Sequence, residues 1–223
     1  MRFCSRLAAS VLLGVLSVAA WGQAAPAQPD PSPPGDPWAA LTGLRQRLAA
    51  EGPQRAEFTQ TYVPAGFTSG ESENGTVALA LPDCLRWDYR EPYPKSFLLC
   101  GHDAYSWNPG EPVGRHYRVE SRDEPGLDLL LLSVEALRAR YGATLKRGEG
   151  GAHEVWLAPL APAANTPVSA TLVLDASGAR LTGLAYRDRE GNQTRFTLAN
   201  YQPIRGGGRD LFEPDRRVEW RDE

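Results

Sequence analysis

The sequence predicts an α+β fold that is mainly β, built as an antiparallel meander of strands with two helical segments. Apolar and polar residues alternate with a period of two in short runs from residue 56 to residue 201. Clusters of Gly, Pro, Asn and Asp separate these runs at intervals of roughly 10 to 14 residues, which suits hairpin connections. Only two segments, residues 36–52 and 127–141, have the apolar content and the end signals of helices.

Length and composition indicate a single globular domain with additional N-terminal sequence. The chain has 223 residues, of which 42% are hydrophobic and 23% are charged. A domain of this size buries enough surface to fold without a metal ion or a disulfide. The 24 Lys and Arg residues nearly balance the 27 Asp and Glu residues, so a nucleic-acid-binding surface is not expected.

Residues 1–24 are predicted to be a secretory signal peptide. Positive charge precedes an apolar run over residues 7–21, and small residues follow that run. The run is shorter than the roughly 20 residues that a membrane-spanning helix needs. Cleavage is expected after Ala24, with Ala20 and Ala27 as alternatives.

Residues 25–37 form a proline-rich segment that contains six prolines. Such a run favours extended polyproline geometry, so we interpret it as a linker ahead of a folded domain at residues 38–220. A proline-rich docking ligand is the alternative interpretation.

The two helical segments differ in character. The first begins after a capping residue, Asp36, and ends at Gly52. Its apolar face is formed by Trp38, Leu41, Leu44 and Leu48. The second segment, residues 127–141, is rich in leucine and has two interpretations: a buried crossover helix that covers one face of a curved sheet, or a lid.

The expected strands follow one another along the chain. Asn74-Gly75 is a turn signal between the first two, and Pro92 with Pro94 breaks the chain after the third. The expected strands lie near residues 56–62, 77–81, 85–89, 97–99, 104–107, 116–119, 154–157, 170–174, 181–186 and 195–201.

Two cysteines are expected to pair as a disulfide. Cys84 and Cys100 are the only cysteines after the signal peptide, and export leads to an oxidising compartment. A hairpin centred on Pro92 would place them opposite each other, on the face away from the large apolar side chains. For a loop of this length, the disulfide is expected to stabilise the folded state by about 3 kcal/mol.

The sequence contains no recognisable catalytic or metal-binding arrangement. His102, His116 and His153 lack the spacing of metal ligands. In residues 66–70 the serine is not at the position that a nucleophile elbow requires. The glycines at 206–208 follow an expected strand and do not precede a helix, so they do not form a phosphate-binding loop. We therefore expect no enzyme activity, no catalytic residue, no metal and no cofactor.

The strand-rich part of the chain carries a series of short motifs in a specific order. They are Phe58-Thr59-Gln60, Gly75-Thr76-Val77-Ala78-Leu79, Pro82, Leu85-Arg86-Trp87, Glu91-Pro92, Gly101 and Asn108-Pro109, and later Leu157-Ala158-Pro159 and Phe212-Glu213-Pro214. In order and spacing these motifs resemble the LolA family of periplasmic outer-membrane lipoprotein carriers. The resemblance covers residues 38–220 and is most specific between Phe58 and Pro109.

The resemblance implies an incomplete, strongly curved antiparallel β-barrel, covered by helices that enclose an apolar cavity. It implies a monomeric periplasmic carrier that accepts lipoproteins from an inner-membrane ABC transporter complex and delivers them to an outer-membrane receptor. Each buried methylene is worth about 0.8 kcal/mol, so acyl chains need shelter in water.

The apolar faces of consecutive strands and the leucine-rich segment supply the expected cavity residues. An apolar stripe of this kind is more often simple core, and the resemblance favours the cavity interpretation for the set. The expected residues are Phe58, Leu79, Leu81, Leu85, Trp87, Tyr89, Phe97, Leu99, Leu130 and Val134.

Two positions depart from the family pattern. Leu81 stands where the family usually has an arginine that holds the helices closed, and Cys100 replaces the usual aspartate before Gly101. Leucine cannot donate hydrogen bonds, so closure or cargo is expected to differ. The alternatives to lipoprotein transport are a related carrier of a glycolipid or another envelope lipid, and a lipid-sensing regulatory module.

Overall fold

The computed structural model describes residues 35–118, 128–161, 167–205 and 208–223. The predicted signal peptide and most of the predicted linker lie outside these residues, as do Val119 and Leu127. None of the described helices is both long enough and apolar enough to cross a membrane.

The described chain forms one sheet of 12 strands in the order β12-β6-β5-β4-β3-β2-β1-β11-β10-β9-β8-β7. Two meanders, β1 to β6 and β7 to β11, are joined by antiparallel pairing of β1 with β11. The strand bounds are β1 Gln54–Val63, β2 Glu71–Ala80, β3 Cys84–Glu91, β4 Lys95–Cys100, β5 Asp103–Trp107, β6 Val113–Arg118, β7 Tyr141–Arg147, β8 His153–Pro159, β9 Ser169–Leu174, β10 Leu181–Arg187, β11 Gln193–Pro203 and β12 Glu219–Asp222.

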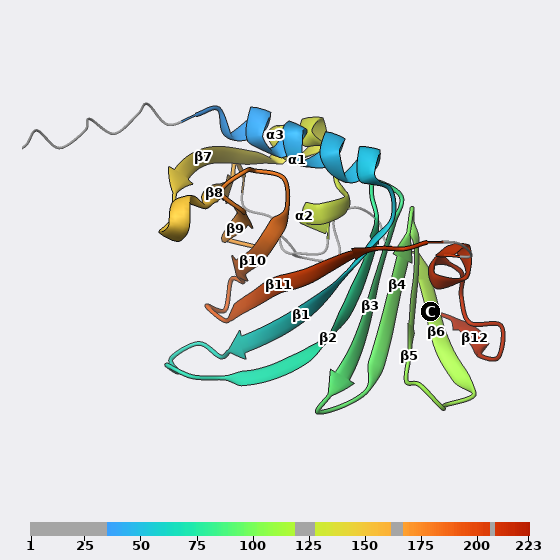
Figure 1. Ribbon diagram of the computed structural model, residues 1–223. Helices are drawn as coiled ribbons and strands as arrows, with labels where there is room; N and C mark the ends of the chain where they lie inside the picture. The colour runs from blue at the N-terminus through green and yellow to red at the C-terminus, as the bar shows by residue number, and fades with distance from the viewer. Residues whose placement is uncertain (1–34, 119–127, 162–166, 206–207) are drawn as a thin grey trace, which may run out of the picture. The chain divides into compact units, whose positions relative to one another are not determined.

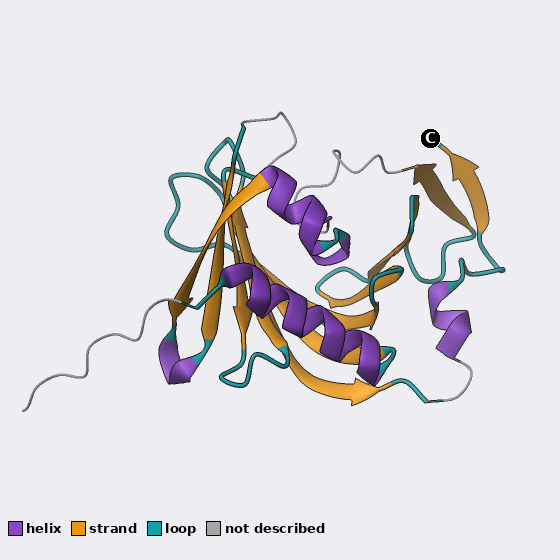
Figure 2. Cartoon of the chain, turned by 90° about the horizontal axis from the view of Figure 1, so that it is seen from above, coloured by secondary structure: helices purple, strands orange, loops and turns teal. Residues whose placement is uncertain are grey.

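The sheet curls around the helices and leaves its two edge strands, β12 and β7, unpaired with each other (Figure 1). Viewed from above, α1 and α3 lie inside the curve of the strands (Figure 2). This arrangement confirms the predicted fold class, a mainly β, incomplete and curved barrel covered by helices.

Helix α1, Pro37–Glu51, forms where the spacing predicted it. The Asp36 side chain caps it by accepting a hydrogen bond from the Trp38 backbone N–H at 2.9 Å. Leu41, Leu44 and Leu48 form its buried face. This face turns toward the sheet because burying a leucine side chain contributes about 2 kcal/mol.

The prediction of one continuous helical segment over residues 127–141 was wrong. The structure has two short helices there, α2 at Asp128–Leu131 and α3 at Val134–Arg140. Ser133 separates them in an extended conformation, and its hydroxyl accepts a hydrogen bond from the Ala136 N–H at 3.1 Å. Serine competes for backbone hydrogen bonds in this way, so it starts a new helix here.

The predicted turn at Asn74-Gly75 was also wrong. Both residues lie within β2, and the connection from β1 to β2 runs through residues 64–70. A Cβ atom on Gly75 would come within 2.9 Å of the Phe58 ring and would also meet the Asp88 carbonyl. This glycine therefore serves close packing across the sheet.

Two strands were not expected from the sequence. Strand β7 follows α3 directly, and β12 pairs with β6 in parallel, the one parallel pair within the described sheet. Two 3-10 turns, η1 at Glu149–Gly151 and η2 at Gly208–Phe212, complete the described secondary structure.

Candidate functional site

The inner face of the curved sheet and the covering helices bring the expected cavity residues together. Six of them are buried, namely Phe58, Leu79, Leu85, Trp87, Leu99 and Leu130. Four are partly buried against the same core, namely Leu81, Tyr89, Phe97 and Val134. Leu99 is set apart, because it packs in a smaller cluster with Ala104 and Tyr117.

The set of expected cavity residues left out part of this apolar interior. The second half of the sheet and the covering helices also supply buried residues, namely Leu41, Leu44, Leu48, Leu129, Leu137, Tyr141, Val155, Leu157, Leu172, Leu174, Leu181, Leu184, Phe196 and Leu198. The period-two pattern of residues 195–201 was the signal for Phe196 and Leu198. Their place beside Phe58 depends on the pairing of β1 with β11, which the local sequence does not specify.

An aromatic cluster lies at the centre of the inner face. The Phe58 ring centroid is 4.7 Å from that of Trp87 and 4.9 Å from that of Tyr89, both edge-on. The Phe196 ring lies 4.9 Å from Trp87. Because Gly75 has no side chain, the Phe58 ring can sit above it between Trp87 and Tyr89.

Polar groups are paired with one another at one end of this cluster. The Tyr89 hydroxyl donates a hydrogen bond to the Gln60 side chain. Lys95 binds Glu73 at 2.7 Å, and its Nζ atom lies 4.5 Å from the Tyr89 ring centroid. Burial, together with the nearby Glu73 carboxylate, raises the pKa of Tyr89, so this hydroxyl stays protonated and remains a donor.

The covering helices are joined by a hydrogen bond that starts in α1. Arg45 donates to the backbone carbonyl oxygen of Leu129 in α2 at 3.3 Å. Burial lowers the pKa of this guanidinium, but arginine remains charged. Leu81 packs against the core, so the contact between the helices comes from α1 and not from position 81.

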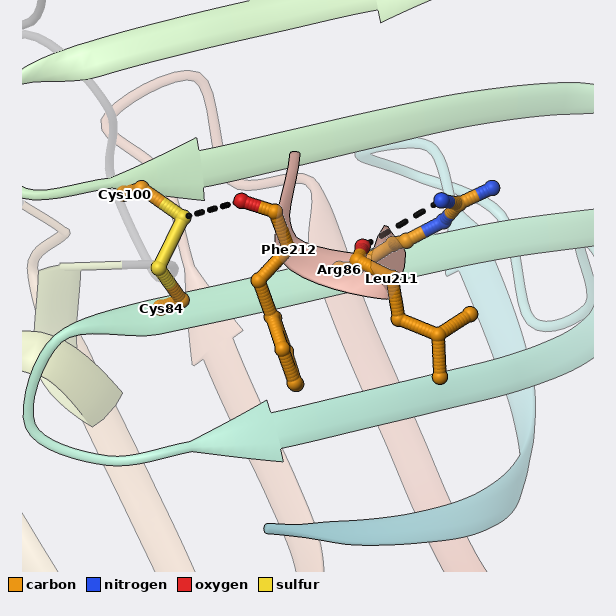
Figure 3. The surroundings of a disulfide bond; sticks show 5 residues. All are labelled: Cys84, Arg86, Cys100, Leu211 and Phe212. Carbon is orange, nitrogen blue, oxygen red and sulfur yellow. Dashed lines mark hydrogen bonds between the residues drawn. A yellow bond between two sulfur atoms is a disulfide. The ribbon is translucent and has the colours of Figure 1, made fainter. Parts of the chain in front are cut away.

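The outer face of β3 and β4 carries the disulfide between Cys84 and Cys100. These residues are direct register partners, which agrees with the hairpin register expected from the sequence. The turn η2 crosses this face, where Arg86 donates to the Leu211 carbonyl at 3.2 Å and the Cys100 sulfur lies 3.5 Å from the Phe212 carbonyl oxygen (Figure 3).

The C-terminal strand is held to the sheet by a histidine between two carboxylates. His116 in β6 lies 2.6 Å from Asp222 of β12 and 3.1 Å from Asp103 of β5. The hydrogen bonds that the protonated imidazole donates to Asp222 and Asp103 raise the pKa of His116. This histidine therefore links β12 to β5 and β6 through its two side-chain partners.

A separate groove of about 550 Å³ lies outside the aromatic cluster. Its lining includes Phe67, Trp156, Arg187 and Arg195. None of the ten residues expected to bind cargo lines this groove.

Comparison with known proteins gives a consistent result. Residues 54–215 match the model of the family described as outer membrane lipoprotein carrier protein LolA. The outer-membrane lipoprotein carrier protein of Shewanella sediminis is 23% identical over 171 residues, covering 76% of this chain and 78% of the relative. That of Shewanella baltica is 24% identical over 170 residues, with the same coverage of both chains.

A solved structure is similar in fold. The crystal structure of an uncharacterized conserved protein from Thermus thermophilus superposes with a TM-score of 0.54 at 8% identity, covering 83% of this chain and 98% of that one. The family match spans most of the sequence and confirms the resemblance seen between Phe58 and Pro109, so the chain belongs to the LolA family of outer membrane lipoprotein carrier proteins.

Proposed function

We propose that this protein is a periplasmic carrier that shelters the acyl chains of lipoproteins between its curved sheet and its helices. It would take them from an inner-membrane ABC transporter complex and deliver them to an outer-membrane receptor. The observation that carries the proposal is the way the sheet is covered. Its continuous apolar inner face is covered by three helices, of which two are only one or two turns long.

The energy of closing the interior is comparable with the energy of binding a guest. Leu41, Leu44 and Leu48 contribute about 2 kcal/mol each when α1 covers the sheet, or roughly 6 kcal/mol together. About eight buried methylenes, at about 0.8 kcal/mol each, would replace that contribution. An ordinary acyl chain is longer than this, so it can insert between the sheet and α1, where the leucine face of the helix covers it.

The carrier needs no covalent step for this task. Apolar contacts are not directional, so a guest held by burial is released when a partner protein moves the helices apart. The inner-face rings contact one another in the structure, which therefore represents a closed state. Opening requires breaking the Arg45 contact between α1 and α2.

The expression of the full chain in cells that make lipoproteins tests the proposal. Mass spectrometry of the purified protein should detect co-purified acylated protein. A matched pair of α1 variants separates the two helix faces: Leu44→Glu places a charge on the buried face, and Gln46→Glu places the same charge on the exposed face. Cargo should be lost with the first variant and retained with the second.

Circular dichroism of both variants serves as the folding control. Empty protein from every preparation would count against a carrier function. Recovery of a glycolipid without acylated protein would instead assign a different cargo to the same interior. A glycolipid carrier is the second candidate function, because Leu81 stands where the family usually has an arginine.

A further inference from the structure

The interior contains a buried hydrogen-bond donor that has no partner. Trp87 is 2% exposed, and its indole Nε1 is the one buried side-chain nitrogen or oxygen without a hydrogen bond among the residues that the structure describes. Indole nitrogen is a donor only, and a buried donor left unpaired costs stability. Such groups are rare in native proteins and require an explanation.

The immediate surroundings of Trp87 supply no acceptor. The rings of Phe58 and Phe196 lie against it, and its register partners in β2 and β4 are Val77 and Phe97. A phenylalanine at this position would pack in the same apolar environment without burying a donor. Packing alone therefore does not account for the indole N–H.

Polar groups further along the same face are already in use. Tyr89 follows Trp87 by two residues, so both side chains point to the inner face. The Tyr89 hydroxyl is bonded to Gln60, and Lys95 is bonded to Glu73. Trp87 thus lies between a polar end with satisfied groups and the apolar region beneath the helices.

An acceptor for Trp87 would have to arrive with a guest, and the surroundings restrict its chemistry. A charged carboxylate would lose its hydration among aromatic rings, whereas a neutral carbonyl loses much less. An acyl ester or amide meets this requirement, because it is a hydrocarbon chain with one neutral carbonyl at its end. We propose that Trp87 donates a hydrogen bond from Nε1 to the carbonyl oxygen of an acyl linkage, and so selects acyl cargo over plain hydrocarbon.

This inference rests on the proposed carrier function, and a comparison of two lipids separates the two ideas. Binding of dipalmitoylglycerol and of its dihexadecyl ether analogue, which has no carbonyl groups, is measured by displacement of a hydrophobic fluorescent probe. Trp87→Phe should weaken ester binding about fivefold more than it weakens ether binding, the factor that one net hydrogen bond predicts. Trp156→Phe, at a site 42% exposed, is the matched control and should change neither.

Nuclear magnetic resonance of the wild-type protein provides a readout that does not depend on the variant folding. The Trp87 indole proton should shift downfield when the ester lipid binds and should not do so with the ether lipid. Equal loss of both lipids in Trp87→Phe, or the same indole shift with both, would overturn the inference while the carrier function stands. Failure of the wild-type protein to bind either lipid would refute the carrier function itself.

Discussion

Removal of the disulfide between Cys84 and Cys100 should lower the stability of the domain by about 3 kcal/mol. The two cysteines are separated by 16 positions, and closing a loop of that length removes about this much chain entropy from the unfolded state. The variant with Cys84→Ala and Cys100→Ala keeps the β3–β4 hydrogen bonds, so its folded state should be little changed.

For a domain of this size, 1 kcal/mol corresponds to about 2 to 4 °C in Tm, so the expected decrease is about 6 to 12 °C. Urea unfolding should also give a larger m-value for the variant, because its unfolded chain is free to expand. Both quantities are measured on the purified protein in oxidising buffer and again with a thiol reductant.

The reductant is the internal control. It should bring the wild-type protein to the Tm of the double variant and should leave the variant unchanged. An unchanged Tm in the double variant, or an equal effect of the reductant on both proteins, would refute the loop-entropy reasoning.

Three further predictions concern the inner face, the helices and the C-terminal strand. Phe58→Ala should cost about 3 to 5 kcal/mol in urea unfolding, because the ring fills the centre of the aromatic cluster; a smaller loss would indicate that the neighbouring rings collapse into the space. Arg45→Met should remove the hydrogen bond between α1 and α2, which contributes about 1.5 to 3 kcal/mol of stabilising free energy. Hydrogen exchange should then accelerate in α2, while β1 remains protected. The hydrogen bonds that protonated His116 donates to Asp222 and Asp103 raise its folded-state pKa. Its stabilisation is therefore fully present below the unfolded pKa of about 6.5 and is lost as pH rises through the folded value. Tm should therefore contain a component that falls above about pH 6.5, and His116→Gln should abolish that component; an unchanged pH profile in this variant would argue against the assignment.

Much of the fold followed from local patterns. Helix α1 begins at its predicted cap, and the hairpin around Pro92 has the predicted register. Alternation of side chains decides which face of a strand is buried, and a short turn decides which residues face each other. Both signals are contained in a few neighbouring residues, so they can be read without the rest of the chain.

Local patterns indicated only part of the aromatic cluster on the inner face. The strand residues of the aromatic cluster share a face because of their spacing, whereas Phe196 joins them from more than a hundred residues away. The Arg45 contact with Leu129 spans 84 positions, and no local pattern indicates it. The carbonyl that accepts this bond belongs to the backbone, which carries no residue-specific signal.

The sequence by itself determined ten of the twelve described strands, their inward faces, the pairing position of the cysteines and the family. The tertiary structure alone decided that β1 joins β11, that β12 adds to β6 in parallel and that Asn74-Gly75 runs through a strand. It also decided that Trp87 is left with an unpaired donor inside the sheet. The physical reason is that alternation and turns act between neighbours in the chain, whereas packing space and unsatisfied hydrogen bonds depend on residues that only folding brings together.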